Sequence, residues 1–210
     1  MVVFDIYKNE IVYYRNTKCG SRTILGWAAI LKHPNILNEH PDWFASSRQY
    51  IGYKEVSNLI PKFEGNPPND QKIRFCIVRD PIDRFISAYT NRILFHKEPD
   101  AAYLGLDYFI DNMNMLMEQP EYKNAKLHFR PQIEDIGKDP SIYTHIFNFK
   151  EIYMVKKLLE EYTHTILPDI HLQQSKDIQK PILTTYQIYK LEKIYQTDYE
   201  VYGEYIQKMP

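Results

Sequence analysis

The amino-acid sequence predicts an α/β fold, a single domain whose mainly parallel sheet is flanked by helices. Short β-branched and aromatic runs alternate with segments whose apolar residues recur at helical spacing. Two predicted strands run directly into helices, one after residue 15 and one after residue 78. The chain of 210 residues, 44% of them hydrophobic, can bury the core of one domain, so we expect residues 1–210 to form one unit.

The N-terminal part is predicted to run strand, strand, loop, helix. Residues 2–7 and 11–15 are β-branched and aromatic, and the polar triplet between them favours a hairpin. After residues 16–20, the spacing of one helix face is kept by Ile24, Trp27, Ala28 and Leu31. The short loop therefore opens directly onto a helix N-terminus.

The rest of the chain continues the alternation of strands and helices. A short apolar run at 73–78 predicts a buried strand, and Pro81 begins an apolar helical stripe. The carboxyl ends of the strands are then the expected ligand edge. The other predicted elements are a surface loop at 65–72, a helix at 108–117, a strand at 143–149, a helix at 151–162 and a long helix at 184–207.

Composition narrows the classes of function. Lys and Arg number 26 against 27 Asp and Glu, so the net charge of −1 does not favour a nucleic-acid partner or a membrane-surface binder. Cys19 and Cys76 are the two cysteines, which argues against a disulfide framework and for a reducing compartment. Because no segment reaches the roughly 18 apolar residues of a membrane span, we expect a cytoplasmic protein.

The first candidate motif is Asn16–Thr23, NTKCGSRT, between a predicted strand and a predicted helix. Backbone N–H groups and the positive end of the helix dipole face one point there, which suits a phosphate or sulfate. Gly20 would let the backbone approach the anion, and Lys18 would supply charge to a bridging oxygen. Ser21 and Thr23 could donate hydroxyl hydrogen bonds. The structural alternative is an ordinary turn with Ser21 as the N-cap.

The second candidate motif is Arg79–Tyr89, RDPIDRFISAY. Since Pro81 starts the helix, Arg79 lies at the strand end and Ser87 two turns along. A guanidinium and a hydroxyl that converge in this way suit a phosphate monoester. In the structural alternative, Asp80 or Asp83 caps the helix and forms a surface ion pair with Arg84.

Together the motifs resemble those of the sulfotransferases that use 3'-phosphoadenosine 5'-phosphosulfate (PAPS), in particular the carbohydrate branch with the uronyl 2-O-sulfotransferases, the sulfotransferase family 2-like branch. Residues 79–89 match the family pattern RDPxxRxxSxY completely. Residues 16–23 are similar to its loop PKxGSTS, with Thr17 in place of proline and Arg22 in place of a small hydroxyl residue. Residues 128–132, HFRPQ, resemble its HWxPQ segment, and 183–205 resemble its closing helix.

The resemblance implies a P-loop-like sulfotransferase fold, PAPS as the co-substrate, no metal, and a hydroxyl acceptor, with a carbohydrate expected. It implies that the first motif grips the 5'-phosphosulfate, the second grips the 3'-phosphate, and residues 171–176 close over the nucleotide. The expected cofactor-binding residues are Lys18, Cys19, Gly20, Ser21, Arg22, Thr23, Arg79, Arg84 and Ser87.

In-line sulfuryl transfer needs charge at the leaving oxygen and a base for the acceptor proton. Lys18 is the candidate for the first task. His128 is the candidate base because histidine titrates near neutral pH, and the neighbouring Arg130 could hold an acidic sugar. Glu55 is the rival base, since it lies in the segment where the uronyl enzymes have a histidine and this chain has none.

Two other functions compete with sulfuryl transfer. A small-molecule kinase would use Asp80 as a magnesium ligand, but a GxxxxGK[ST] loop has its lysine after the second glycine, whereas Lys18 precedes Gly20. A non-catalytic adenosine-bisphosphate sensor or glycan-binding module would keep the anion sites and lack a base. Turnover distinguishes the second alternative from an enzyme.

Overall fold

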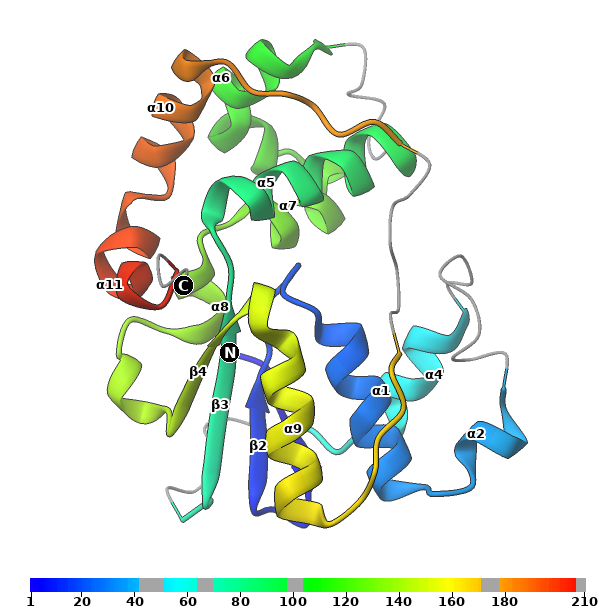
Figure 1. Cartoon of the computed structure of the whole chain (residues 1–210). Helices are drawn as coiled ribbons and strands as arrows, with labels where there is room; N and C mark the ends of the chain where they lie inside the picture. The colour runs from blue at the N-terminus through cyan, green and yellow to red at the C-terminus, as the bar shows by residue number, and fades with distance from the viewer. Residues whose placement is uncertain (42–50, 64–69, 98–103, 171–177, 207–210) are drawn as a thin grey trace.

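A four-stranded sheet lies at the centre of the structure, a computed structural model that describes residues 1–41, 51–63, 70–97, 104–170 and 178–206 (Figure 1). The strands follow their sequence order across the sheet, β1-β2-β3-β4. β1 pairs with β2 in antiparallel fashion, and β2, β3 and β4 are parallel. Their bounds are β1 Val3–Tyr7, β2 Ile11–Tyr14, β3 Ile73–Val78 and β4 His145–Asn148. The predicted α/β fold with a mainly parallel sheet is confirmed.

The central strands are buried on both faces, as parallel strands covered by helices must be. Successive side chains of a strand point to opposite faces. In β2, Ile11 and Tyr13 join one core cluster, whereas Val12 and Tyr14 join another. The first cluster contains residues of α1 Ser21–Lys32, α4 Ile51–Leu59 and α9 Ile152–Thr163, and the second contains residues of α8 Gln132–Ile136 and α11 Gln196–Ile206.

A separate group of helices packs beyond the carboxyl ends of the parallel strands (Figure 1). Its core is rich in aromatic rings, among them Phe85, Phe109 and Phe129, whose centroids lie 5.0–6.3 Å apart. The helices of this lobe are α5 Pro81–Tyr89, α6 Leu106–Met117, α7 Lys123–Phe129 and α10 Thr185–Ile194. The lobe places α5 and α7 above the edge where ligands are expected.

Short elements join these layers. A π-helix, η1 Thr90–Phe95, continues directly from α5. The others are α2 Ile36–Glu39 and the 3-10 turns η3 Pro120–Tyr122, η4 Pro140–Ile142 and η5 Phe149–Glu151. No helix of the described residues is long and apolar enough to span a membrane.

Two predicted elements differ in the structure. The long helix at 184–207 is two helices, α10 and α11, separated at Tyr195. The buried Tyr195 hydroxyl donates to the Phe129 carbonyl at 2.7 Å, which fixes the turn inside the helical lobe while α11 goes on to cover the sheet. The predicted α-helical stripe from Pro81 ends at Tyr89, where the π-helix begins. The predicted loop at 65–72 lies mostly outside the described residues.

Candidate active site

The two motifs meet at the carboxyl edge of the sheet. β2 ends at Tyr14 and β3 at Val78, and because these strands are parallel neighbours, the segments that follow them leave from one edge. The Arg79 guanidinium donates from Nη1 to the Lys18 carbonyl oxygen at 3.1 Å. The prediction that both motifs share this edge is confirmed.

The loop before α1 turns sharply at the helix N-terminus. Lys18 and Gly20 have φ values of 66° and 76°, so the chain turns sharply on both sides of Cys19. The first N–H groups of a helix lack intrahelical partners, and the first turn of α1 carries no acidic residue. An anion placed there would meet free N–H groups and the positive end of the α1 dipole.

Lys18 adds charge to this point. Its ammonium group donates to Asn91 Oδ1 of η1. Burial lowers the pKa of Lys18 to about 7, and the nearby guanidinium groups, first Arg92 and then Arg22 and Arg79, act in the same direction. Crowded cations of this kind are costly without an anion, so the cluster fits a phosphate or sulfate ligand.

Gly20 has no room for a side chain. A Cβ at this position would lie 2.5 Å from Ile152 Cδ1 and 3.3 Å from the Phe149 ring. Glycine is therefore required by its positive φ and by the close approach of η5 and α9. That Gly20 lets the backbone approach an anion stays a prediction.

The other side chains of the first motif differ in their accessibility. The Ser21 hydroxyl donates to the Asn16 carbonyl at 2.9 Å and lies 3.1 Å from the Tyr13 hydroxyl. Gly20 is the N-cap of α1, without a side-chain hydrogen bond, so the alternative with Ser21 as the cap is wrong. Cys19 is buried, and burial raises the pKa of its thiol to about 12. Thr23 is also buried and Arg22 is half-buried.

Asp80 caps the helix of the second motif. Its Oδ1 accepts from the backbone N–H groups of Ile82 at 2.9 Å and Asp83 at 3.0 Å, and Pro81 occupies the first helical position. Its Oδ2 accepts from the Tyr199 hydroxyl at 3.1 Å. The capping alternative is confirmed for Asp80, and these hydrogen bonds argue against the kinase hypothesis, which needs this carboxylate for magnesium.

Arg84 is completely buried and holds three segments together. Its Nε donates to the Thr17 carbonyl at 2.9 Å and its Nη1 to the Arg130 carbonyl at 2.7 Å. Its Nη2 lies 3.8 Å from Asp135 Oδ2. The expected surface ion pair with Asp80 or Asp83 is therefore wrong. Contact of Arg84 with a nucleotide stays a prediction, against which its full burial argues.

Arg79 and Ser87 are the residues of the second motif that are predicted to hold a phosphate. The Arg79 guanidinium lies over the Phe149 ring at 4.6 Å, and burial lowers its pKa. Stacking fixes the plane of a guanidinium and thereby directs its donors. Ser87 lies half-buried two turns along α5.

Two residues outside both motifs, Gln132 and Asp198, fix the edge on which the motifs lie. Gln132 accepts from the Asn16 amide at 2.8 Å and from the Arg79 backbone N–H at 3.0 Å, and it donates to the Arg79 carbonyl at 2.8 Å. Asp198 accepts from the N–H groups of Gln132 and Ile133 at 2.8 and 3.0 Å. Sequence analysis missed these roles, although Gln132 and Asp198 lie in segments that resemble the family.

Arg130 does not extend freely into a cleft. Its Nη2 donates to Asp135 Oδ1, and Asp135 also accepts from the Thr17 N–H at 2.9 Å. The Arg130 side chain is 28% exposed. The pairing shows how HFRPQ supports the first motif, whereas a contact between Arg130 and an acidic sugar stays a prediction.

His128 lies among cations near Lys18. Burial lowers its pKa to about 2, and the charge of Lys18 is the next largest cause, followed by Arg92 and Arg15. Its Nδ1 is buried and has no hydrogen-bond partner among the described residues. The imidazole is therefore neutral at ordinary pH and retains a nitrogen that can accept a proton.

The remaining predicted and missed residues lie on α4, on η1 and outside the described residues. Glu55 lies half-buried on α4, which packs against α1, and its buried Oε2 has no hydrogen-bond partner in the described part of the chain. Asn91 and Arg92 were missed because the π-helical spacing of η1 cannot be recognised from an α-helical period. The predicted lid at 171–176 lies outside the described residues. Within the described ranges, no group of three or more His, Cys, Asp or Glu side chains could hold a metal.

Comparison with known proteins gives one match. A family model described as "Sulfotransferase family" matches residues 3–205, which is nearly the whole chain. No curated protein matches, and no solved structure matches.

Proposed function

This chain belongs to the sulfotransferase family, and we propose that it moves a sulfuryl group from PAPS to a hydroxyl of a carbohydrate, a polysaccharide or glycolipid. The family implies PAPS as the sulfate donor. The observation that best supports the finer proposal is the hydrogen bond from Arg79 to the Lys18 carbonyl. It joins two anion sites, as a ligand with phosphate groups at both ends requires.

The donor is proposed to lie along this edge. The N–H groups that begin α1 would hold the 5'-phosphosulfate, with Lys18 on the bridging oxygen. Arg79 and Ser87 would hold the 3'-phosphate, which distinguishes PAPS from adenosine 5'-phosphosulfate. Arg84 and Cys19 would position the loop from within the protein, since both are fully buried.

The transfer step places charge at two atoms. The acceptor oxygen attacks sulfur, the bond from sulfur to the bridging oxygen breaks, and its electron pair remains on the 5'-phosphate. Lys18, which donates to Asn91 in this structure, would exchange that bond for the bridging oxygen. Because charge grows on this oxygen during the reaction, the contact strengthens at the transition state.

His128 is proposed to take the proton of the acceptor. Burial, and after it the charges of the surrounding cations, keep the pKa of His128 far below neutrality. The phosphates of bound PAPS would offset these charges and raise the pKa toward the value that general-base catalysis needs. Glu55 remains the rival base. The guanidinium groups near His128, Arg15 and Arg92, favour an acceptor with a negative charge, such as an acidic sugar.

Calorimetric titration with adenosine 3',5'-bisphosphate, in the absence of metal, tests the donor site. We expect binding at least about tenfold tighter than that of adenosine 5'-phosphate, since a charge-assisted contact to the 3'-phosphate contributes about 1.5–3 kcal/mol. ATP is the second control. Preference for magnesium-ATP would instead support the kinase.

The base is tested by paired substitutions. His128→Asn should reduce kcat by about 10²–10⁴ while adenosine 3',5'-bisphosphate still binds, and Glu55→Gln should leave kcat within a few-fold. The reverse pattern would assign the base to Glu55. A wild type that binds the nucleotide but turns over no member of a panel of carbohydrate, phenol and lipid acceptors would favour the sensor or glycan-binding alternative.

A further inference from the structure

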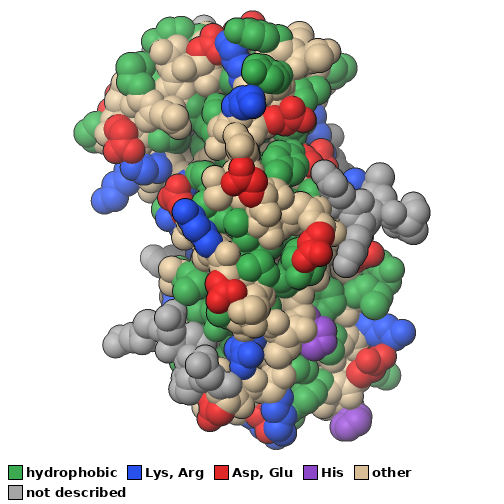
Figure 2. Space-filling model, turned by 90° about the vertical axis from the view of Figure 1, so that its left-hand side faces the viewer, with side chains coloured by type: hydrophobic (Ala, Val, Ile, Leu, Met, Phe, Trp, Pro, Cys, Tyr) green, Lys and Arg blue, Asp and Glu red, His purple; other side chains and the backbone are tan. Residues whose placement is uncertain are grey.

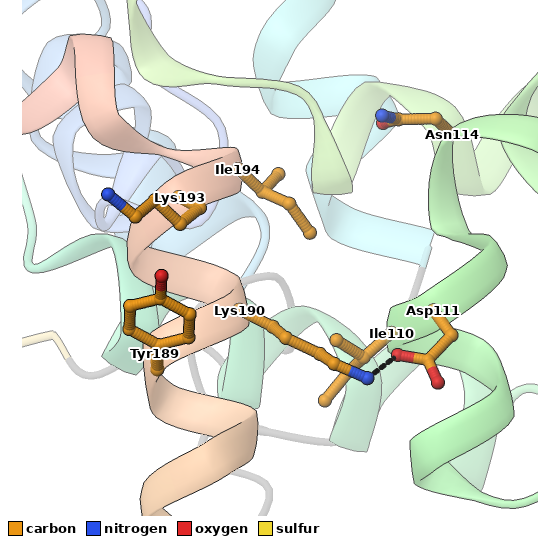
Figure 3. A pocket seen from close by; sticks show the side chains of 7 residues that line it. All are labelled: Ile110, Asp111, Asn114, Tyr189, Lys190, Lys193 and Ile194. Atoms are coloured by element: carbon orange, nitrogen blue, oxygen red, sulfur yellow. Dashed lines mark hydrogen bonds and ion pairs between the residues drawn. The ribbon is translucent and has the colours of Figure 1, made fainter.

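A cavity of about 280 Å³ with a mixed polar and apolar lining lies between α6 and α10, and none of its lining residues belongs to either motif (Figure 3). This volume is near the lower limit of small-molecule sites, which span about 300–1,000 Å³. It has room for one small ring. Ile110, which is buried, and Ile194, which is partly buried, supply the apolar part of the lining.

The polar side of the cavity offers donors and acceptors side by side. Lys190 of α10 extends across to Asp111 of α6 and forms an ion pair with it, as Figure 3 shows. Asn114, one turn after Asp111, contributes an exposed amide. A carboxylate, an ammonium group and an amide can form further hydrogen bonds after one ion pair forms. The adjacent hydroxyl groups of a sugar each donate and accept hydrogen bonds, so they need donors and acceptors side by side.

The cavity is lined by one tyrosine ring, and a second ring lies one turn away on α10. Tyr189 lines it and is 55% exposed, and Tyr186, one turn earlier, is 63% exposed. Lys193 lies 5.6 Å from the centre of the Tyr189 ring and Lys190 lies 4.2 Å from that of Tyr186. Cation–π contacts of this kind restrict the rings, so a ligand would lose less entropy in ordering them. A restricted aromatic face suits the apolar C–H face of a sugar.

The net charge of the cavity lining indicates which class of sugar would bind. Asp111 compensates Lys190, which leaves Lys193 as the surplus charge of the lining. On the face that α10 and α11 occupy, basic and acidic side chains are interspersed (Figure 2). The surface therefore lacks the one-sign field that would attract any polyanion, and recognition would depend on the cavity itself.

We propose that this cavity binds one unit of an acidic carbohydrate chain, in addition to the transfer site. The inference rests on the proposal that the acceptor is a carbohydrate. A second contact of this kind would raise affinity for long acceptors over short ones, because both sites would hold the same chain.

Spectra of the isoleucine δ1 methyl groups can observe both sites at once. Ile110 and Ile194 report on the cavity, whereas Ile152, which packs against Gly20, reports on the nucleotide loop. The probes are an unsulfated chondroitin tetrasaccharide, uncharged maltotetraose and adenosine 3',5'-bisphosphate, each added alone. We expect the chondroitin tetrasaccharide to shift Ile110 and Ile194, and the bisphosphate to shift Ile152.

Two substitutions localise the binding. Tyr189→Ala and Asn114→Ala should each raise the dissociation constant measured at Ile110 by about fivefold, the effect expected for the loss of one stacking or hydrogen-bonding contact. Tyr153→Ala, at an equally exposed tyrosine of α9, is the matched control and should leave it unchanged.

Three results would overturn the proposal: no shift at Ile110 and Ile194 with the chondroitin tetrasaccharide, shifts that both variants leave unchanged, or equal affinity for maltotetraose. Shifts at these methyl groups that follow protein concentration without sugar would assign the cavity to self-association instead. A bisphosphate that fails to shift Ile152 would contradict the proposed function alone, so the two failures are distinguishable.

Discussion

The two motifs differ in how many of their residues support the fold and how many are available to a ligand. The second motif matches the family pattern completely, yet Asp80 caps α5 and the buried Arg84 ties the Thr17 and Arg130 carbonyls together. The first motif departs from the pattern twice, yet it contains Lys18 and leads directly into the N-terminus of α1, the parts proposed to contact the ligand. The second motif, which matches the family pattern completely, therefore mainly supports the site. The first motif, which matches it less well, is the one proposed to act on the ligand.

The largest expected effect is on folding. Arg84→Met leaves Asp135 buried among fewer positive charges and leaves two carbonyls without their donor, so we expect the free energy of unfolding to fall by about 3–5 kcal/mol. Urea denaturation measures it. Arg79→Met is the control within the same motif and should cost far less stability. A stable Arg84→Met that no longer binds the nucleotide would show instead that Arg84 contacts the ligand.

Lys18→Met should have a large effect on catalysis with little effect on folding. We expect kcat to fall by about 10²–10³, the loss typical of one donor at a developing oxyanion, while affinity for adenosine 3',5'-bisphosphate falls by a much smaller factor. Single-turnover kinetics with PAPS and calorimetry measure the two quantities. Lys157→Met, at an exposed lysine of α9, is the control. Equal losses in both quantities would make Lys18 a binding residue only.

The proposed role of the second motif in ligand binding is to hold the 3'-phosphate through Arg79 and Ser87. Arg79→Ala or Ser87→Ala should weaken binding of adenosine 3',5'-bisphosphate by about tenfold and leave the weaker binding of adenosine 5'-phosphate unchanged. Calorimetry with both nucleotides measures this difference. If the affinity for both nucleotides falls by the same factor, the second motif only supports the loop. The first motif would then be the one that contacts the ligand.

The smallest effect is a change of protonation in the first motif. The pKa of Lys18 is lowered to about 7, so the amine is largely neutral in the free protein at pH 8. A bound anion raises this pKa, and the complex then holds more protons than the free protein. By linkage, affinity should fall as the pH rises above about 7, with uptake of up to about one proton at pH 8.

Calorimetry in buffers of different ionisation enthalpy measures the proton uptake. Lys18→Met should abolish it, and His128→Asn serves as the control for the other titratable group of the cluster. Uptake that persists in Lys18→Met would assign the proton to His128 or to the nucleotide phosphates.

The sequence allowed the fold to be predicted wherever local pattern and tertiary packing agree. The β-branched runs of β2 and β3 and the helix start at Pro81 are local signals, and both were predicted correctly. Local period failed where the helix geometry changed. The π-turn of η1 and the break at Tyr195 depend on contacts with Lys18 and with the Phe129 carbonyl, which lie far away in sequence.

The sequence by itself determined the α/β architecture, the edge at which both motifs lie and the resemblance that led to the sulfotransferase family. Only the tertiary structure shows which residues of each motif stabilise the fold instead of being available to a ligand. Hydrogen-bond donors are identical in the sequence whether they face a ligand or a buried carbonyl. Burial separates them: the donors of the fully buried Arg84 reach backbone oxygens inside the protein, whereas the half-buried Lys18 has a side-chain partner that a ligand can replace.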